Sequence, residues 1–133
     1  MALRNYKIGG AVTDTPTDGK CLWKRVATTK YETLATFAGA YQVPVGKTLY
    51  VTHILLNGDT ANWSIEFGYG DDAVNGSATP PTNSVKQCED LGSAAAFNTL
   101  DLSVFFPVPA GKYPYVFGNG AGNVACTIQG FEI

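Results

Sequence analysis

Apolar residues in this chain recur at every second position, in short runs that end at glycine, proline, asparagine or aspartate. The clearest run is Trp63–Gly70, where the odd positions are mostly large and apolar and the even positions are small or polar. Thr99–Phe106 alternates in the same way, and its even-numbered apolar residues are predicted to point inward. A period of two is that of a β-strand with one buried face. The pattern therefore predicts a chain built from short strands.

Weaker alternation marks six further segments. They are Tyr6–Val12, Cys21–Ala27, Tyr31–Val43, Thr48–Leu56, Tyr113–Phe117 and Val124–Ile133. Only Val85–Ala96 has a helical option, and Gly92 limits that helix to one or two turns. Strands that follow one another without helices pair mainly antiparallel. We therefore expect an all-β, antiparallel β-sandwich of the jelly-roll kind, with about eight strands in a single domain over residues 1–133.

Length and charge exclude several classes of function. A chain of 133 residues can bury a core of its own without a stabilising metal. Nine basic and eleven acidic residues give a net charge of -2, which disfavours nucleic-acid binding. No apolar run has the length of a membrane span, and the first residues lack the apolar stretch of a secretion signal. We expect neither a membrane nor a nucleic acid as partner.

Two segments carry apolar residues on both strand faces. In Thr48–Leu56, Leu49, Val51 and Leu55 oppose Tyr50, Ile54 and Leu56. With only 15% charged residues in the chain, we interpret this excess as surface reserved for other subunits. In the last strand the apolar positions of Val124–Ile128 share one face, but Phe131 and Ile133 fall on the other. A bulge at Gly130 would return them to the first face.

A nine-residue pattern, V-P-x-G-K-x-x-Y-V, occurs twice, at Val43–Val51 and Val108–Val116. Proline and glycine at this spacing favour a tight turn. We predict a type I turn between antiparallel neighbours at each copy. The copies are 108 − 43 = 65 residues apart, about half the chain, which suggests two similarly built halves that face each other.

Residue types that carry catalysis are sparse. His53 is the single histidine and lies between apolar neighbours in a predicted strand, which favours a core or interface position. The nucleophile motif G-x-S-x-G does not occur. The sets weighed as metal ligands are Cys21, Cys88, Cys126 and His53 for zinc, and Asp59, Asp71 and Asp72 for calcium. The cysteines lack paired spacing and a strand separates Asp59 from the other two aspartates. We expect free thiols, solvated carboxylates, no cofactor and no enzymatic activity.

Loops and aromatic residues remain as candidate surfaces. The glycine-rich segment Gly118–Asn123 opens no helix, so it predicts a flexible hairpin tip and no phosphate site. Trp23, with Arg25 on the same strand face, has three interpretations: a buried ring, which we favour, an oligomer contact, or a sugar-stacking platform. Tyr113 and Tyr115 form a second possible surface cluster. Asp71 and Asp72 open the longest unstructured loop, Asp71–Ser84.

From about residue 30 to 133, the turn and strand segments resemble small jelly-roll virion proteins of tailed bacteriophages, among them capsid decoration and head- or tail-fibre modules. The segments that carry the resemblance are Tyr41–Thr52, Phe106–Lys112 and Ile128–Ile133. It implies a non-enzymatic virion protein, made in the host cytoplasm and assembled, often as a trimer, onto major capsid or tail proteins. The alternative is a carbohydrate-binding module for host-receptor adhesion. A cupin-type enzyme would need more than one histidine.

Overall fold

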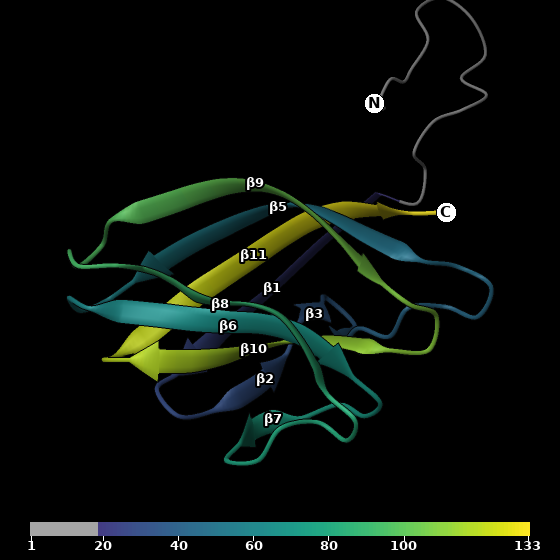
Figure 1. Cartoon of the computed structure of the whole chain (residues 1–133), viewed down its shortest axis with the longest axis horizontal. Coiled ribbons are helices and arrows are strands. Elements are labelled where there is room, and N and C mark those ends of the chain that lie inside the picture. Colours follow the sequence, from purple (N-terminus) through teal and green to yellow (C-terminus); the bar gives the residue numbers. More distant parts are fainter. Residues whose placement is uncertain (1–18) are drawn as a thin grey trace, which may run out of the picture.

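The computed structural model describes residues 19–133, and within this range the chain forms eleven strands and no helix (Figure 1). The strands are β1 (Gly19–Ala27), β2 (Tyr31–Thr33), β3 (Ala35–Thr36), β4 (Gly39–Ala40), β5 (Leu49–Gly58), β6 (Trp63–Gly70), β7 (Asn75–Ser77), β8 (Val85–Ser93), β9 (Thr99–Val108), β10 (Tyr113–Gly120) and β11 (Asn123–Glu132). The expected strand Tyr6–Val12 lies outside the described residues.

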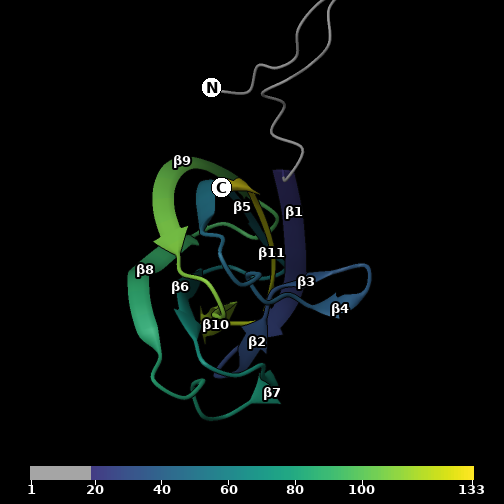
Figure 2. The same ribbon diagram turned by 90° about the vertical axis from the view of Figure 1, so that its right-hand side faces the viewer.

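Two antiparallel sheets pack face to face. The six-stranded sheet has the order β4-β3-β1-β11-β5-β9, and the five-stranded sheet has the order β7-β2-β10-β6-β8. Without the short edge strands β3, β4 and β7, four strands of one sheet, β1-β11-β5-β9, face four of the other, β2-β10-β6-β8. This is a jelly roll, and the predicted antiparallel sandwich is confirmed. Figure 2 shows β8 and β9 along one side of the sandwich and the β3–β4 hairpin beside β1 on the other.

The core lies between the sheets and is made by alternate residues of both. Trp63, Ile65 and Phe67 of β6 are buried, as the alternation predicted. The inward residues predicted in β9 point inward but are only partly buried; they are Leu100, Leu102, Val104 and Phe106. β9 is an edge strand, and the facing edge strand β8 contains two register shifts opposite β6. The side of the sandwich between β8 and β9 is therefore less closely packed than its centre.

A bulge in β5 corrects two expectations. Gln129 of β11 pairs with His53, but the next residue, Gly130, pairs with Val51, so Thr52 is an extra residue in β5. The alternation of β11 continues through this point, and Phe131 stays on the outer face. Gly130 is needed because a Cβ there would lie 2.2 Å from the carbonyl oxygen of Tyr50.

The same bulge shifts the phase of β5 by one residue. Leu49 and Val51 before it, and Ile54 and Leu56 after it, all become buried on the inner face. The apparent apolar excess of this segment is thus used by the sandwich interior. Of the six apolar residues only Tyr50 and Leu55 stay on the outer face, so the expectation of a subunit interface stays a prediction.

Two further segments differ from their predictions. The expected strand Tyr31–Val43 is broken into β2, β3 and β4, because the chain crosses from one sheet to the other at the buried Leu34. Val85–Ser93 is a strand and not a helix, since it pairs along β6. Asp90 has a φ of 61° at one of the irregularities in β8. These bulges kink an exposed edge and limit its pairing with other chains.

The two V-P-x-G-K corners lie side by side. The Val43 N–H donates to the Lys112 carbonyl oxygen at 3.0 Å, and the Gly111 N–H donates to the Val43 carbonyl oxygen at 2.8 Å. Gly46 and Gly111 have φ of 80° and 79°, which is typical of the third position of a type II turn rather than the predicted type I. Neither corner joins neighbouring strands: the second passes from β9 in one sheet to β10 in the other.

The turns that contain Thr28, Asp59, Phe97 and Gly122 gather at the opposite end of the sandwich. Gly118–Asn123 lies there and crosses from β10 to β11, so it joins the two sheets and is not a hairpin tip. Backbone hydrogen bonds join it to neighbouring turns, from the Thr28 N–H to the Gly122 oxygen at 3.1 Å and from the Asp59 N–H to the Asn123 oxygen at 3.0 Å. This end of the sandwich is held together by backbone hydrogen bonds between its turns.

Candidate functional site

The outer face of the six-stranded sheet presents exposed side chains from four long neighbouring strands. We define it by the outward-pointing residues of β1, β11, β5 and β9, which pair in that order. Strand register aligns these residues in rows. One row is Trp23, Thr127, Leu55 and Asp101, and the next two are Cys21, Gln129, His53 and Ser103, and Arg25, Ala125, Asn57 and Thr99. Side chains from strands far apart in sequence thus meet on one face.

An aromatic row crosses this face at the end where β1 begins. The rings of Tyr50 and Phe105 stack with centroids 5.1 Å apart, and those of Tyr50 and Phe131 stack at 5.5 Å. Phe105 is 62% exposed and Ile133 extends the row at the end of the chain. Rings exposed on a sheet face favour contact with another molecule. Sequence reasoning did not select these residues, although Phe105 and Phe131 break the apolar phase of their strands.

Trp23 and Arg25 lie together on the outer face, as their spacing predicted. Trp23 is 56% exposed, so the favoured interpretation as a buried ring was wrong. Alternation alone could not decide between the two faces of β1, because Leu22 and Val26 occupy the inner one. Trp23 therefore remains a candidate for an oligomer contact or a sugar platform.

Charges on the outer face are paired within the chain but remain accessible. The Arg25 guanidinium donates to Asp59 Oδ2 at 3.0 Å, and His53 pairs with Asp101. The backbone N–H of Asn123 donates to Asp59, and this hydrogen bond lowers the pKa of the Asp59 carboxyl. His53 therefore lies outside the core. It contacts the carboxylate of Asp101 and not a nucleophile, and it belongs to the paired polar groups of the outer face.

The expected surface cluster of Tyr113 and Tyr115 is not a free surface. Tyr115 is only 1% exposed, and its hydroxyl donates to Glu66 Oε2 at 2.7 Å. Lys86 Nζ lies 3.4 Å from Glu66 Oε1. Burial raises the pKa of Tyr115 far above its usual range, and the Glu66 carboxylate reinforces the shift. Tyr113 is half-buried beside it.

The ring of Tyr115 packs beside Gly68 of β6 and the ring of Tyr31 of β2, whose centroid is 5.6 Å away. The long loop lies against the same sheet. Pro81 of the loop packs over Gly70, Val74 and Thr33 exchange hydrogen bonds, and β7 pairs with β2. Asp71–Ser84 therefore folds onto the five-stranded sheet and is not the unstructured stretch that the sequence suggested. The two surfaces predicted as interfaces are adjacent to each other, and much of each is used within the molecule.

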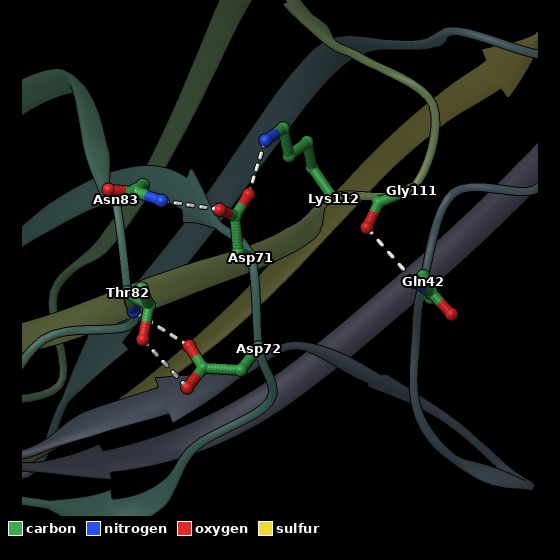
Figure 3. A network of polar contacts seen from close by, with 7 residues as sticks. All are labelled: Gln42, Asp71, Asp72, Thr82, Asn83, Gly111 and Lys112. Atoms are coloured by element: carbon green, nitrogen blue, oxygen red, sulfur yellow. Dashed lines mark hydrogen bonds and ion pairs between the residues drawn. The ribbon is translucent and has the colours of Figure 1, made fainter.

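Asp71 and Asp72 close this loop, as Figure 3 shows. Asp71 contacts Lys112 and accepts a hydrogen bond from Asn83 Nδ2 at 2.7 Å. Asp72 accepts the backbone N–H and the hydroxyl of Thr82 at 2.7 and 3.1 Å. The Lys112 ammonium, followed by the Asn83 amide, lowers the pKa of Asp71. Both carboxylates are thus structural, and Lys112 provides the positive charge near them.

The described residues contain no group of three or more His, Cys, Asp or Glu placed to hold a metal ion. Asp59 precedes β6, whereas Asp71 and Asp72 follow its far end. Cys126 is buried, which raises the pKa of its thiol, while Cys88 is half-buried and Cys21 exposed. Over the same residues no helix is long and apolar enough to cross a membrane.

Comparison with known proteins provides one structural likeness. No protein-family model matches the sequence. No curated protein matches it either. The structure is similar to a chain from a structure of infectious bursal disease virus, Gx strain, with 7% sequence identity and a TM-score of 0.38. The match covers 98% of this chain and 36% of the viral chain, so this chain spans about a third of that length.

Proposed function

We propose that this protein is a non-enzymatic structural component of a virion, a capsid decoration or head- or tail-fibre module that self-associates and attaches to major capsid or tail proteins. The jelly-roll sandwich is a fold shared by viral capsid proteins, lectins and cupins, so the fold alone does not select among them. The resemblance to virion accessory proteins of tailed bacteriophages favours a viral structural protein over a lectin or a cupin. The resemblance also suggests that the protein is made in the host cytoplasm and assembles as a trimer.

The observation that carries this proposal is the outer face of the six-stranded sheet. Its aromatic row and Trp23 stand on paired strands, so they are held in place before any partner arrives. A rigid aromatic surface loses little conformational entropy on binding. Interfaces between proteins are enriched in such residues at their centres.

Light scattering of the full chain and co-sedimentation with capsids or tails of the encoding virus test the proposal. We expect an oligomer that sediments with one of these particles, and Phe105→Ala should weaken both properties. Val85→Ala is the matched control, because Val85 is an exposed apolar residue on β8 of the other sheet. A stable monomer without affinity for either particle would contradict the proposal.

A carbohydrate-binding module for host adhesion is the second candidate, and the exposure of Trp23 favours it. Gln129 and Thr127 of the neighbouring strand offer polar groups beside the indole ring. An exposed tryptophan next to hydrogen-bonding side chains suits the stacking of a sugar ring. A glycan array followed by calorimetry tests it: affinity for any glycan that is lost in Trp23→Ala supports this candidate, and no binding across the array contradicts it.

A further inference from the structure

We infer that the partner on the outer face of the six-stranded sheet is a second copy of this chain, packed face to face about a two-fold axis that runs parallel to the strands between β11 and β5. This inference rests on the proposed function and names the contact through which self-association occurs. It predicts that Arg25 of one copy lies beside Asp101 of the partner subunit, twice in each pair.

The inference starts from the strand order. β1, β11, β5 and β9 are consecutive in the sheet, so a two-fold axis between β11 and β5 exchanges β1 with β9 and β11 with β5. An axis parallel to the strands keeps each row of residues opposite the same row of the partner subunit. Packed sheets lie about 10 Å apart with nearly aligned strands, which is the geometry that this operation produces.

This exchange matches the aromatic row to itself. Phe131 and Tyr50 are register partners on β11 and β5. The two-fold axis therefore places Phe131 over the partner's Tyr50 and Tyr50 over the partner's Phe131. Phe105 then lies over the side of the partner subunit where β1 begins. The most apolar part of the face covers the most apolar part of its copy, as an isologous interface requires.

The same exchange brings opposite charges together. Trp23 lies over the partner's Asp101, and Arg25 occupies the next row on the same strand face, about 7 Å along β1. An arginine side chain spans that distance. The side chains of Arg25 and Asp101 are 61% and 62% exposed despite their partners within the chain, so each can accept a second one. Complementary charges of this kind set the register of an interface.

A two-fold axis perpendicular to the strands lacks both matches. It would keep β1 over the partner's β1 and reverse the order of the rows. With that axis midway between the rows of Thr127 and Gln129, Phe131 would meet the partner's Ala125. Wherever the axis lies along the strands, Asp101 would lie over β9 of the partner subunit, far from its Arg25 on β1. Only the axis parallel to the strands satisfies the aromatic row and the charges together.

The test reverses one charge in each of two variants, Arg25→Glu and Asp101→Lys. Sedimentation equilibrium at low salt measures self-association, and native mass spectrometry of an equimolar mixture identifies mixed pairs. Each variant alone places like charges across the axis, so we expect its dissociation constant to rise by about tenfold or more. In the mixture every contact again joins opposite charges, and mixed pairs should form with the wild-type dissociation constant.

Two controls separate charge on this face from other effects. Glu89→Lys makes the same change of charge on β8 of the other sheet and should leave association unchanged. Asp59→Asn removes the charge that pairs with Arg25 within the chain and leaves Arg25 and Asp101 in place, so the dissociation constant should not rise. Thermal unfolding shows that each variant is folded.

The inference predicts an even number of copies, since a two-fold pairing makes a dimer or joins two trimers. A monomeric wild type, or a mixture of the two variants that forms no mixed pairs, overturns it. An odd-numbered assembly that still sediments with capsids or tails overturns the two-fold pairing alone and leaves the proposed function standing.

Discussion

Trp23 and Trp63 show how the same residue type in the same alternating pattern takes opposite roles. Both lie in strands with apolar residues at every second position. Trp63 points into the sandwich, where its Nε1 donates to the Ala95 oxygen at 3.3 Å, whereas Trp23 points away from it. A tryptophan is buried when it lies on the strand face that the opposing sheet covers. Which face is covered depends on residues elsewhere in the chain.

This contrast predicts different stability costs for the two tryptophans. Trp63→Ala removes a fully buried ring and should lower the free energy of unfolding by about 3–5 kcal/mol. Trp23→Ala removes an exposed ring and should change it by about 0.5 kcal/mol or less. Urea denaturation at a concentration where the protein is monomeric measures both. A large loss for Trp23→Ala in the monomer would show that Trp23 packs within the chain.

At the level of single elements, β5 shows why counting alternate positions is not enough. Simple alternation places apolar residues on both faces of this strand, and such an excess predicts an interface. Thr52 resolves it, because one extra residue turns Ile54 and Leu56 to the same side as Leu49 and Val51. The apolar residues of β11 also change phase, between Ile128 and Phe131. β11 has no extra residue there, so Phe131 stays on the outer face.

Deletion of Thr52 should therefore be tolerated, because it removes the bulge and lets His53 and Val51 pair with consecutive residues of β11. Simple alternation then still places Leu49, Val51, Ile54 and Leu56 on the inner face. Deletion of Leu55, which lies beyond the bulge, should instead turn Leu56 to the outer face. The loss of this buried aliphatic side chain should lower the free energy of unfolding by about 2–5 kcal/mol. Urea denaturation compares the two variants, and an unfolded Thr52 deletion variant would contradict the role assigned to the bulge.

The loop Asp71–Ser84 is the second element whose role was not visible in the sequence. Its small, polar, proline-containing composition is typical of an exposed functional loop. Asp71 ties it to Lys112 at the start of β10, β7 ties it to β2, and Asp72 holds its two ends together. No local pattern announces such contacts, because each of them joins residues distant in sequence.

On the scale of the whole molecule, strand order predicts where the fold is most stable. β11 pairs on both sides with β1 and β5, and β6 pairs on both sides with β10 and β8. β9 has one neighbour, and β8 has one neighbour with two register shifts. Backbone groups of central strands exchange only when the sandwich opens, whereas edge strands open locally.

Hydrogen exchange should follow this order. We expect the slowest amide exchange in β11, β5, β6 and β10 and faster exchange in β8. β9 should exchange quickly in the monomer, and the outward residues of β9 should become protected on self-association if the outer face is the interface. Mass-spectrometric exchange at two protein concentrations measures this, and slow exchange in β8 would contradict the packing described.

The sequence by itself determined that this chain forms strands, where most of them lie, and which face of β6 and β9 points inward. These properties depend on neighbours two residues apart, which a local pattern records. The tertiary fold was needed to show that Tyr115 is buried, that Thr52 forms a bulge, and that Trp23 and the aromatic row face outward. Each of these features depends on which strand or sheet lies opposite the residue. Strands and sheets pair through contacts between residues far apart in sequence, and a pattern of near neighbours does not record such contacts.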